Sequence, residues 1–561
     1  MFVMKKHYFV FLFAVFSWLG LQSQTPTWNW AQKLTGPYYD FSYDITKDAD
    51  EDIYITGQFD TWLFDGNDTL KAYGGKDGYL LKMNTNGVIK KIIKVGSRQV
   101  FSAAEESVSC IAVDPQKNIY IAGRYNTDSL FIDTIILPRY SGQPTNTNYA
   151  FIAKLDSNFK AIWAKPIKCG SIDFPSSLEV DKDGNVYLTG KFAGNFTMIG
   201  NDSILGNGRM TIVKFNPNGN ILWYRNFGGS GEITDVAFDN NNDVYITGVF
   251  IGTAQFGNAT LSAPNTNEDA CVLKLSKTNG SIIWLKHITG IGRSFATAIE
   301  VSSADEVYVG GYFGSNTDYK KDTLIIGNDS VIAASSDYED IFLAKMDLAG
   351  NVLWLKRYGA TYNDYLYSMR LDSSDRLYFA GYFTTQTIIG NNTFTGSGDV
   401  IIAHIDSLGG VVWVGKGGGP NSSDRPSGLM PLDNGQVFVC GIYNQITYFG
   451  NIMLTANTTY GTGQSDVYLA TIYYPLITSL NEAASNLISF AVYPNPADNY
   501  LSILSADKIS YLKIYDLNGR ELLADYSVNK TTIDISALPA GFYVLEVSVN
   551  GNIGRKKFIK E

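Results

Sequence analysis

The sequence predicts an all-β fold in two parts, a large repeat body and a small C-terminal sandwich. Only 17% of the 561 residues are charged, whereas 14% are aromatic and 54 are glycine. This balance favours many short strands joined by tight turns over long polar helices or disorder. Two further observations support the prediction. A strand motif recurs along most of the chain, and one strand at the start makes up for a strand missing after the last repeat.

The recurring motif is a strand of the form aliphatic, aromatic, apolar, any residue, glycine. Its seven copies end, at spacings of 58 to 70 residues, at Gly57, Gly123, Gly190, Gly248, Gly311, Gly381 and Gly441. Each repeat contains four strand-like runs separated by turns such as Asp-Gly and Asn-Gly, which are typical of tight hairpins. A period of this length indicates copies of one supersecondary unit, here a four-stranded antiparallel meander.

The fourth strand of the repeats predicts how the body closes. In most repeats it carries a tryptophan, at Trp163, Trp223, Trp284, Trp354 and Trp413, and Lys91 stands at that place in the first repeat. The seventh repeat lacks this strand, but residues 27–36 match it with Trp30 in register. We therefore expect the N-terminal strand to pair beside Val467 and to close a seven-bladed β-propeller over residues 27–474. An open stack of meanders is the alternative.

Residues 1–24 are similar to a secretory signal peptide, because two lysines precede an apolar run from Tyr8 to Leu21. The run is shorter than the ~20 residues of a membrane-spanning helix. A retained anchor is therefore the weaker alternative, and the mature chain is expected to have no stable transmembrane segment. Export through the periplasm permits disulfides, but the sequence leaves open the state of Cys110, Cys169, Cys271 and Cys440.

Charge and composition argue against several classes of function. The formal charge is −10, from 44 basic and 54 acidic residues, so nucleic acid is not expected as a partner. The cysteines form no CxxC pair and the chain has only three histidines, so zinc sites and histidine-based triads are not expected. We expect no cofactor, with calcium as the metal to test.

Acidic residues recur where the chain passes from the fourth strand of one repeat to the first strand of the next. They are Asp40, Glu106, Asp173, Glu232, Asp364 and Asp424. Because these connections lead into the innermost strands, we expect the acids to rim one mouth of the channel and to attract a cation or a basic partner. A solvated rim of turn residues is the alternative. Asp40, Asp173 and Asp364 are the candidate calcium ligands.

Two turns superficially resemble calcium-binding loops. Residues 181–185 (DKDGN) and 239–243 (DNNND) place acids at alternate or nearby positions. They lack the downstream bidentate glutamate of a twelve-residue calcium loop. Since both stand where a hairpin turn is required, we interpret them as turns.

The repeats also resemble a known family. The D-x-x-G-N-x-Y-x-x-G strand pair, the D-x-x-x-A-K strand and the N-G-x-x-x-W strand are similar to the SBBP-type propeller repeat of exported bacterial proteins, over about residues 27–474. This resemblance implies a seven-bladed ring but no particular activity.

Residues 490–561 alternate strands with Pro and Asn-Gly turns, which predicts a small immunoglobulin-like β-sandwich after a linker at residues 475–489. The segment resembles the type A C-terminal sorting domain of the type IX secretion system. This resemblance rests on Tyr493, Pro494, Asn495, Pro496, Asp516, Gly519, Arg520, Gly541, Tyr543, Lys556, Lys557 and Phe558. It implies the type IX translocon and a surface sortase as partners, and a location outside or on the outer membrane of a Gram-negative bacterium.

Triplets of Asp, Ser or Thr, and an aliphatic residue resemble the O-glycosylation acceptor of bacteria that use type IX export. Their acceptor residues are Thr69, Ser129, Thr134, Ser203, Thr323, Ser330 and Ser407. Asp followed by Ser or Thr is also ordinary turn chemistry, so both interpretations stay open.

From these features we expect an exported binding protein whose propeller takes an extracellular glycan or protein as ligand. A polysaccharide-directed hydrolase or lyase is the first alternative, and a structural surface adhesin is the second. The sequence contains no sialidase-type box and assigns no catalytic residue, so an enzyme is not expected.

Overall fold

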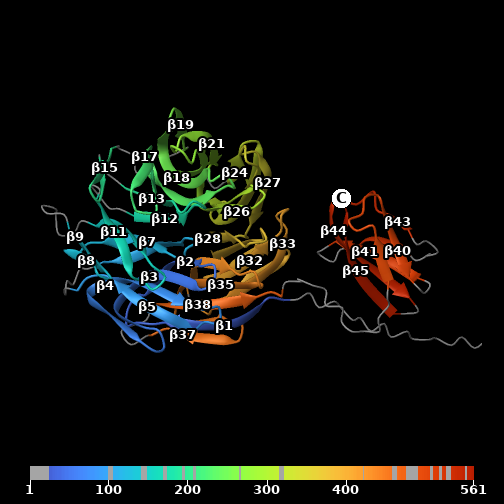
Figure 1. Cartoon of the computed structure of the whole chain (residues 1–561), viewed down its shortest axis with the longest axis horizontal. Coiled ribbons are helices and arrows are strands. Elements are labelled where there is room, and N and C mark those ends of the chain that lie inside the picture. The colour runs from blue at the N-terminus through green and yellow to red at the C-terminus, as the bar shows by residue number, and fades with distance from the viewer. Residues whose placement is uncertain are drawn as a thin grey trace, which may run out of the picture. The chain divides into compact units, whose positions relative to one another are not determined.

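The computed structural model divides the chain into two compact units, Met1–Pro475 and Leu476–Glu561, which are described separately (Figure 1). The predicted signal peptide and nearly all of the predicted linker lie outside the described residues. Every described helix or strand element is a β-strand. None of the described residues forms a helix with the length and hydropathy needed to cross a membrane. The structure describes residues 25–98, 105–139, 148–168, 174–192, 196–205, 210–263, 267–314, 321–420, 423–457, 464–475, 490–505, 509–516, 521–525, 532–549 and 552–560.

The first unit consists of four-stranded antiparallel blades, each numbered from its inner strand outwards. Blade 1 comprises β2 (Phe41–Lys47), β3 (Ile53–Phe64), β4 (Thr69–Met83) and β5 (Ile89–Val95). Blade 2 comprises β6 (Ser107–Val113), β7 (Ile119–Tyr125), β10 (Tyr149–Leu155) and β11 (Ala161–Lys168). Blade 3 comprises β12 (Phe174–Val180), β13 (Val186–Lys191), β16 (Met210–Phe215) and the first half of β17 (Ile221–Phe238).

The second half of β17 begins the next blade, so one long strand joins two blades. Blade 4 continues with β18 (Val244–Phe256), β20 (Glu268–Leu275) and β21 (Ile282–Thr289). Blade 5 comprises β22 (Arg293–Val301), β23 (Val307–Gly314), β26 (Glu339–Met346) and β27 (Val352–Tyr358). Blade 6 comprises β28 (Asp364–Leu371), β29 (Leu377–Phe383), β32 (Asp399–Ile405) and β33 (Val411–Gly417). Blade 7 comprises β34 (Arg425–Pro431), β35 (Gln436–Asn444), β38 (Ser465–Tyr473) and β1 (Thr27–Leu34).

The N-terminal strand completes blade 7. Strand β1 pairs antiparallel with β38, with Trp30 opposite Thr471 and Leu34 opposite Val467. The pairing predicted from the missing fourth strand is therefore confirmed. The inner strands contact one another in the cyclic order β2, β6, β12, β17, β22, β28, β34 and back to β2, so the first unit is a closed β-propeller.

Short strands between the second and third strand of the blades reach back to the preceding blade. For example, β14 pairs with β11 through Ile199 and Ile167, β24 with β21 through Ile326 and Ile288, and β36 with β33 through Phe449 and Gly417. These contacts extend outer strands that would otherwise end as open sheet edges. The short strands are β8 (Ser129–Ile132), β9 (Ile135–Pro138), β14 (Phe196–Ile199), β15 (Asp202–Leu205), β19 (Ala259–Ser262), β24 (Thr323–Ile326), β25 (Asp329–Ile332), β30 (Gln386–Ile389), β31 (Asn392–Thr395), β36 (Ile446–Phe449) and β37 (Ile452–Thr455).

The motif glycine allows the inner strand to bulge. In blade 1, Ser42 lies opposite Gly57 and Asp44 opposite Thr56, which leaves Tyr43 as the extra residue. A Cβ on Gly57 would lie 2.0 Å from the carbonyl oxygen of Phe41, so another residue at this position would collide with the inner strand. The same two-against-one register recurs in β6, β12, β17, β22, β28 and β34.

The repeated tryptophan binds the next blade along the ring. The indole N–H groups of Trp163, Trp223, Trp284 and Trp354 donate to backbone carbonyls in the next blade's turn between third and fourth strand, at 2.9–3.1 Å. In blade 1, Lys91 donates from Nζ to the carbonyl of Asn158 at 2.6 Å. The substitution of Lys for Trp therefore keeps the contact between neighbouring blades.

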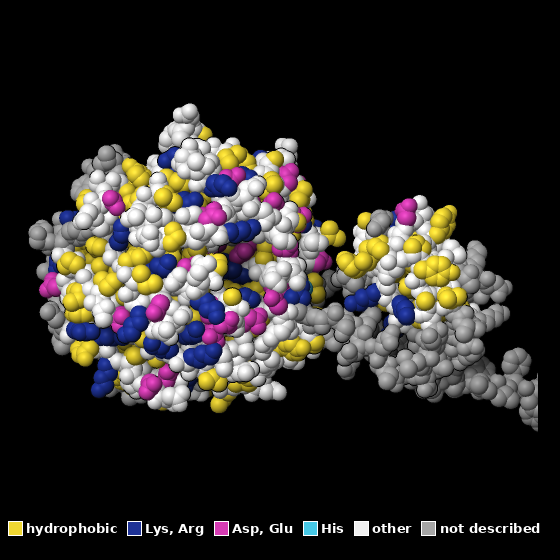
Figure 2. All heavy atoms as spheres, in the orientation of Figure 1, with side chains coloured by type: hydrophobic (Ala, Val, Ile, Leu, Met, Phe, Trp, Pro, Cys, Tyr) yellow, Lys and Arg dark blue, Asp and Glu magenta, His cyan; other side chains and the backbone are white. Residues whose placement is uncertain are grey.

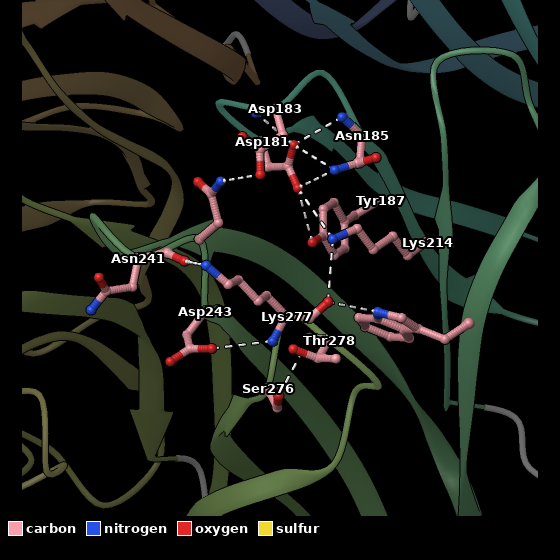
Figure 3. A network of polar contacts seen from close by, with 12 residues as sticks. Asp181, Asp183, Asn185, Tyr187, Lys214, Asn241, Asp243, Ser276, Lys277 and Thr278 are labelled. Carbon is pink, nitrogen blue, oxygen red and sulfur yellow. Dashed lines mark hydrogen bonds and ion pairs between the residues drawn. The ribbon is translucent and has the colours of Figure 1, made fainter.

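The turns that resemble calcium loops are held by protein groups (Figure 3). Asp181 Oδ1 accepts the N–H groups of Asp183 and Asn185, at 3.0 and 2.8 Å. Its Oδ2 accepts the hydroxyl of Tyr187 at 3.1 Å and lies 3.3 Å from Lys214 Nζ. Asp239 has the equivalent partners in blade 4. These carboxylates are saturated by the turn, which supports their interpretation as hairpin chemistry.

The second unit consists of two sheets around one apolar core that includes Leu501, Ile514, Leu545 and Phe558. One sheet contains β39 (Phe490–Tyr493), β40 (Tyr500–Ser505) and β43 (Thr532–Asp534). The other contains β41 (Ile509–Asp516), β42 (Glu521–Asp525), β44 (Gly541–Val549) and β45 (Asn552–Lys560). This is the two-layer arrangement predicted for the C-terminal segment.

Candidate functional site

The acids predicted to rim the channel are mostly inside the protein. Asp40, Glu106, Asp364 and Asp424 have at most 1% of their surface exposed. Glu232 is half-buried, and Asp173 lies outside the described residues. The prediction of a solvent-facing acidic rim was therefore wrong for the four buried acids.

These acids are buried because they fasten the connection between blades. Asp364 Oδ2 accepts the N–H of Ala360 at 2.9 Å. Asp424 Oδ2 accepts the N–H of Gly419 at 3.1 Å and the hydroxyl of Thr447, on the short strand β36, at 2.9 Å. The sequence gives the positions of these residues but not the direction of their side chains.

Burial also changes their charge. Desolvation raises the pKa of Glu106 to about 8 and that of Asp364 to about 7, and it raises the pKa of Asp40 well above its ordinary value. Nearby acids in the neighbouring blade, Asp77 beside Glu106 and Asp340 beside Asp364, contribute in the same direction. Burial therefore disfavours negative charge on these three acids, which argues against an anionic funnel.

The described residues contain no group of three or more His, Cys, Asp and Glu placed to hold a metal ion. The calcium candidates Asp40 and Asp364 belong to different blades, 1 and 6: Asp40 accepts the N–H of Asp60 on β3, and Asp364 accepts that of Ala360. The two residues therefore do not share one site. Cys110, Cys271 and Cys440 are buried free thiols, and Cys169 is outside the described residues.

A ring of hydroxyl groups, missed by the sequence analysis, lines the channel. The residue that bulges from each inner strand carries a hydroxyl in every blade: Tyr43, Ser109, Ser176, Thr234, Thr297, Tyr367 and Ser427. Each keeps some exposure, and the inner strands are the innermost elements of the ring. The signal was present in the sequence, because each of these residues precedes its motif glycine by 14 positions.

Above this hydroxyl ring, the connections into the inner strands make one mouth of the channel. In blade 1, Tyr39, Phe41 and Tyr43 form a ladder of nearly parallel rings, with centroids 6.4 and 6.1 Å apart and planes within 11° and 4°. The Tyr43 hydroxyl donates to Gln58 Oε1 at 2.9 Å. Desolvation raises the pKa of Tyr43 to about 12, so its hydroxyl stays protonated near neutral pH.

A second aromatic group, here called the aromatic arc, spans blades 5 and 6. Phe295 stacks on Tyr312 at 5.2 Å, and Tyr312 meets the edge of Tyr365 at 4.9 Å. Tyr365 in turn contacts Tyr367 and Tyr382, with centroids 6.5 and 6.1 Å away. Tyr39 is 45% exposed and Tyr367 is 39% exposed. The ladder and the arc therefore present aromatic surface to solvent at the mouth.

Arginines lie against these rings. The guanidinium of Arg293 lies 5.4 Å from the Tyr312 centroid, and that of Arg425 lies 5.2 Å from the Tyr382 centroid. In blade 2, Arg124 covers Phe174, which is 39% exposed, at 5.0 Å. Arg293 also pairs with Glu268 and Glu339, at 2.6 and 3.1 Å. The mouth thus combines flat apolar surface with hydrogen-bond donors.

Charged side chains cross the channel below the hydroxyl ring. Arg370 extends from blade 6, with Nη2 3.9 Å from Glu179 of blade 3, and Nη1 3.9 Å from Asp235 of blade 4 and 3.3 Å from Glu300 of blade 5. A side chain that reaches three other blades must lie close to the ring axis. We call these four residues the channel floor.

The channel floor carries more acids than bases. Desolvation raises the pKa of Glu179 to about 8 and that of Glu300 to about 7, while Arg370 acts in the opposite direction on both. Asp44 of blade 1, whose pKa burial raises to about 6, also belongs to this electrostatic group. On the face shown in Figure 2, basic and acidic side chains are likewise intermixed rather than segregated.

The two described histidines serve packing. His404 is buried, desolvation lowers its pKa to about 4, and its ring stacks on Tyr378 at 4.7 Å. His287 lies 2.7 Å from Asp269, which also accepts the hydroxyl of Thr289 at 2.8 Å. Because Thr289 donates to the carboxylate and not to the imidazole, this trio lacks the geometry of an activated nucleophile.

The residues of the sorting signal hold the C-terminal strand in place. Asn495 donates from Nδ2 to the carbonyl of Lys557 at 3.3 Å, and its Oδ1 accepts the N–H of Ile559 at 2.8 Å. Tyr543 donates to the carbonyl of Pro539 at 2.7 Å and stacks on the buried Phe558. Tyr493 is exposed, and Gly519 and Arg520 lie outside the described residues.

The C-terminal unit also matches a known family by sequence. Residues 491–561 match the secretion system C-terminal sorting domain. This segment is a type IX sorting domain. The protein is therefore delivered by the type IX machinery to the cell surface, the outer membrane or the exterior, and the sorting domain engages that machinery.

Relatives of the propeller are distant. An uncharacterised WD repeat-containing protein of Acanthamoeba polyphaga mimivirus is 24% identical over 296 residues, which are 44% of this chain and 21% of the relative. The chain thus spans about a fifth of that relative's length.

Among solved structures, Drosophila Semaphorin 2a is 9% identical, with 96% of this chain and 97% of that chain covered at a TM-score of 0.37. A catalytically inactive virginiamycin B lyase from Staphylococcus aureus is 10% identical, with 78% and 98% covered at a TM-score of 0.30. Because these TM-scores are low, the fold is assigned here from the strand pairing alone.

Proposed function

We propose that this exported propeller is a glycan-binding protein whose ligand enters the mouth formed by the aromatic ladder and the aromatic arc. The observation that carries the proposal is the combination of the exposed aromatic rings of Tyr39 and Tyr367 with the hydroxyl ring, to which Tyr367 itself belongs. Sugar rings offer apolar C–H faces and hydroxyl edges. Aromatic faces cover the former, and Ser, Thr and Tyr hydroxyls can both donate to and accept from the latter.

Charge supports a largely neutral ligand over a strongly basic one. Burial raises the pKa of Asp40, Glu106 and Asp364 and so disfavours negative charge on them, and the arginines at the mouth lie on aromatic rings. A rigid ring that presents its side chains from strands, rather than from long loops, also limits the entropy lost on binding.

A glycan array probed with the purified mature chain tests this proposal. We expect binding to a defined subset of glycans. Binding to no glycan, together with capture of a protein ligand that the Tyr367→Ala variant no longer captures, would replace the glycan by a protein at the same mouth. Tyr448→Ala is the control, because Tyr448 is equally exposed at 39% but lies on the short strand β36.

A hydrolase is the second candidate, and one observation favours it. Glu179 and Glu300 of the channel floor have raised pKa values beside further carboxyl groups, a pattern found in acid catalysis. Both, however, share Arg370, which occupies the space between them. We expect bound oligosaccharides to remain intact on prolonged incubation. Shortening that is abolished by Glu179→Gln would establish the hydrolase instead.

O-glycosylation at the Asp-Ser/Thr-aliphatic triplets is a separate proposal. Thr69, Thr134, Ser203, Ser330 and Ser407 are exposed, while Ser129 and Thr323 are half-buried. The first four lie on the short strands, at their turns or at the start of β4, where they are accessible. Intact mass of the native mature protein tests the proposal, and a mass equal to that of the polypeptide alone contradicts it.

A further inference from the structure

We infer that the mouth binds the end of a glycan chain and not its middle. This inference rests on the proposed function and adds the mode of recognition to it. Three features of the channel carry the argument: its direction, its closed wall and its floor.

The aromatic ladder follows the channel. Tyr39 lies two residues before β2, Phe41 is the first residue of the strand and Tyr43 follows two residues later, so successive rings descend towards and along the strand. Because β2 is an innermost strand and runs from this mouth towards the opposite face, the ladder leads into the channel and not across it. Sugar rings that stack in turn on Tyr39, Phe41 and Tyr43 therefore extend along the ring axis.

The wall around the ladder has no open side. The inner strands contact one another in a complete circle, and every blade contributes one hydroxyl at the level of Tyr43. An open cleft would let a polymer pass through the site with both ends outside. A closed wall admits a chain only end first. Ser109, Ser176 and Thr297 donate their hydroxyl hydrogens to backbone carbonyls of the wall, which leaves their oxygens to accept hydrogen bonds from the terminal sugar.

The channel floor limits how far the chain enters. Arg370, Glu179 and Glu300 each lie three residues beyond the bulge of their strand. This places their backbone about 10 Å below the hydroxyl ring. The guanidinium of Arg370 lies within 3.3–3.9 Å of carboxylates from blades 3, 4 and 5, of which Asp235 is nearest the hydroxyl ring, and so closes the path along the axis. Only the last few sugar units therefore fit between the mouth and the floor.

Chain length separates end recognition from internal recognition. The full mature protein is titrated with maltodextrin, xylan, laminarin and mannan fractions, each prepared as short, intermediate and long chains at equal molar concentration of chains. For the series that binds, we expect the Kd per chain to stay constant once the chain exceeds the few units that fill the channel. The Phe41→Ala and Tyr39→Ala variants are expected to weaken binding equally at all lengths. Tyr39 is exposed, so its removal leaves folding intact if that of Phe41 does not.

The other outcomes are distinct. A Kd per chain that keeps falling in proportion to chain length shows binding to internal units, which overturns this inference but leaves the proposed glycan-binding function standing. A stronger effect of Tyr39→Ala on long chains than on short ones also overturns it. Failure of all four series to bind contradicts the proposed function itself.

Discussion

Removal of Arg370 is expected to destabilise the propeller in a pH-dependent manner. The Arg370→Leu substitution takes away the cation that lies within 3.3–3.9 Å of Glu179, Asp235 and Glu300. Loss of one partner from a buried ionic group costs about 3–5 kcal/mol. With an unfolding entropy of about 2.1 cal/mol/K per residue, a ring of roughly 450 residues loses about 1 °C of Tm for each kcal/mol. We therefore expect Tm to fall by about 3–5 °C near pH 8.

The effect becomes smaller in acid. Burial raises the pKa values of Glu179 and Glu300, so these carboxyls contribute stability that is complete below their unfolded-state pKa and is lost as pH rises through about 7 to 8. Arg370 opposes this loss by stabilising the ionised forms. Near pH 5 the carboxyls are largely protonated with or without Arg370, and only hydrogen bonds worth about 1–2 kcal/mol are lost.

Thermal unfolding of the wild type and the variant at the two pH values, at one scan rate, measures the difference. Lys160→Met is a suitable control, because Lys160 is 65% exposed and pairs with Asp133 at the surface, where a pair contributes about 0–1 kcal/mol. An equal fall in Tm at both pH values, or no fall near pH 8, would refute the ionic role of the channel floor.

Three further predictions follow from single contacts. Burial raises the pKa values of Glu106 and Asp364 to about 8 and 7, so the wild-type propeller should become less stable as pH rises from about 5 to 8.5. Asp364→Asn should flatten this pH dependence of Tm in thermal unfolding. A wild-type Tm that rises over this range contradicts the assignment. Lys91→Ala should lower the free energy of unfolding by about 0.5–1.5 kcal/mol, because it removes the hydrogen bond to Asn158. Lys91→Trp should keep the wild-type free energy of unfolding, as measured by urea denaturation. Equal losses in both variants would show that a tryptophan at this position does not replace the contact that Lys91 makes. Asn495→Ala removes two hydrogen bonds to β45, worth about 1–3 kcal/mol together. The variant should show faster amide exchange in residues 552–560 and should be trapped in the periplasm. Unchanged exchange would mean that Asn495 does not hold this strand.

The architecture could be predicted from the sequence because its determinants are local and repeated. Each hairpin is specified by its own turn, and the missing fourth strand of the last repeat could be matched to residues 27–36 by pattern alone. The pairing of Leu34 with Val467 follows from that count. The sequence did not show how Lys91 replaces the tryptophan of the other repeats, because its hydrogen bond is made to a backbone carbonyl in the next blade.

The candidate site was predicted less well. Acids such as Asp424 were located correctly in the connections, but their burial depends on a hydroxyl from another element, here Thr447. The residues of the hydroxyl ring recur at a fixed distance before the motif glycine. They were missed because the position is occupied by Ser, Thr or Tyr, and the sequence analysis looked for acidic residues. The channel floor was missed because the position three residues beyond the bulge carries arginine in one blade, glutamate in two and uncharged residues in the others, so residue type does not repeat there.

The central claim is that the aromatic mouth binds glycan, and the matched pair Tyr367→Ala and Tyr448→Ala tests it most directly. Both side chains are 39% exposed, but only Tyr367 stands at the mouth. In an equilibrium titration with the glycan that binds best, Tyr367→Ala should weaken binding by about 10-fold, as expected for one aromatic contact, while Tyr448→Ala leaves the Kd unchanged. Equal affinity of the two variants and the wild type would place the ligand elsewhere and contradict the account.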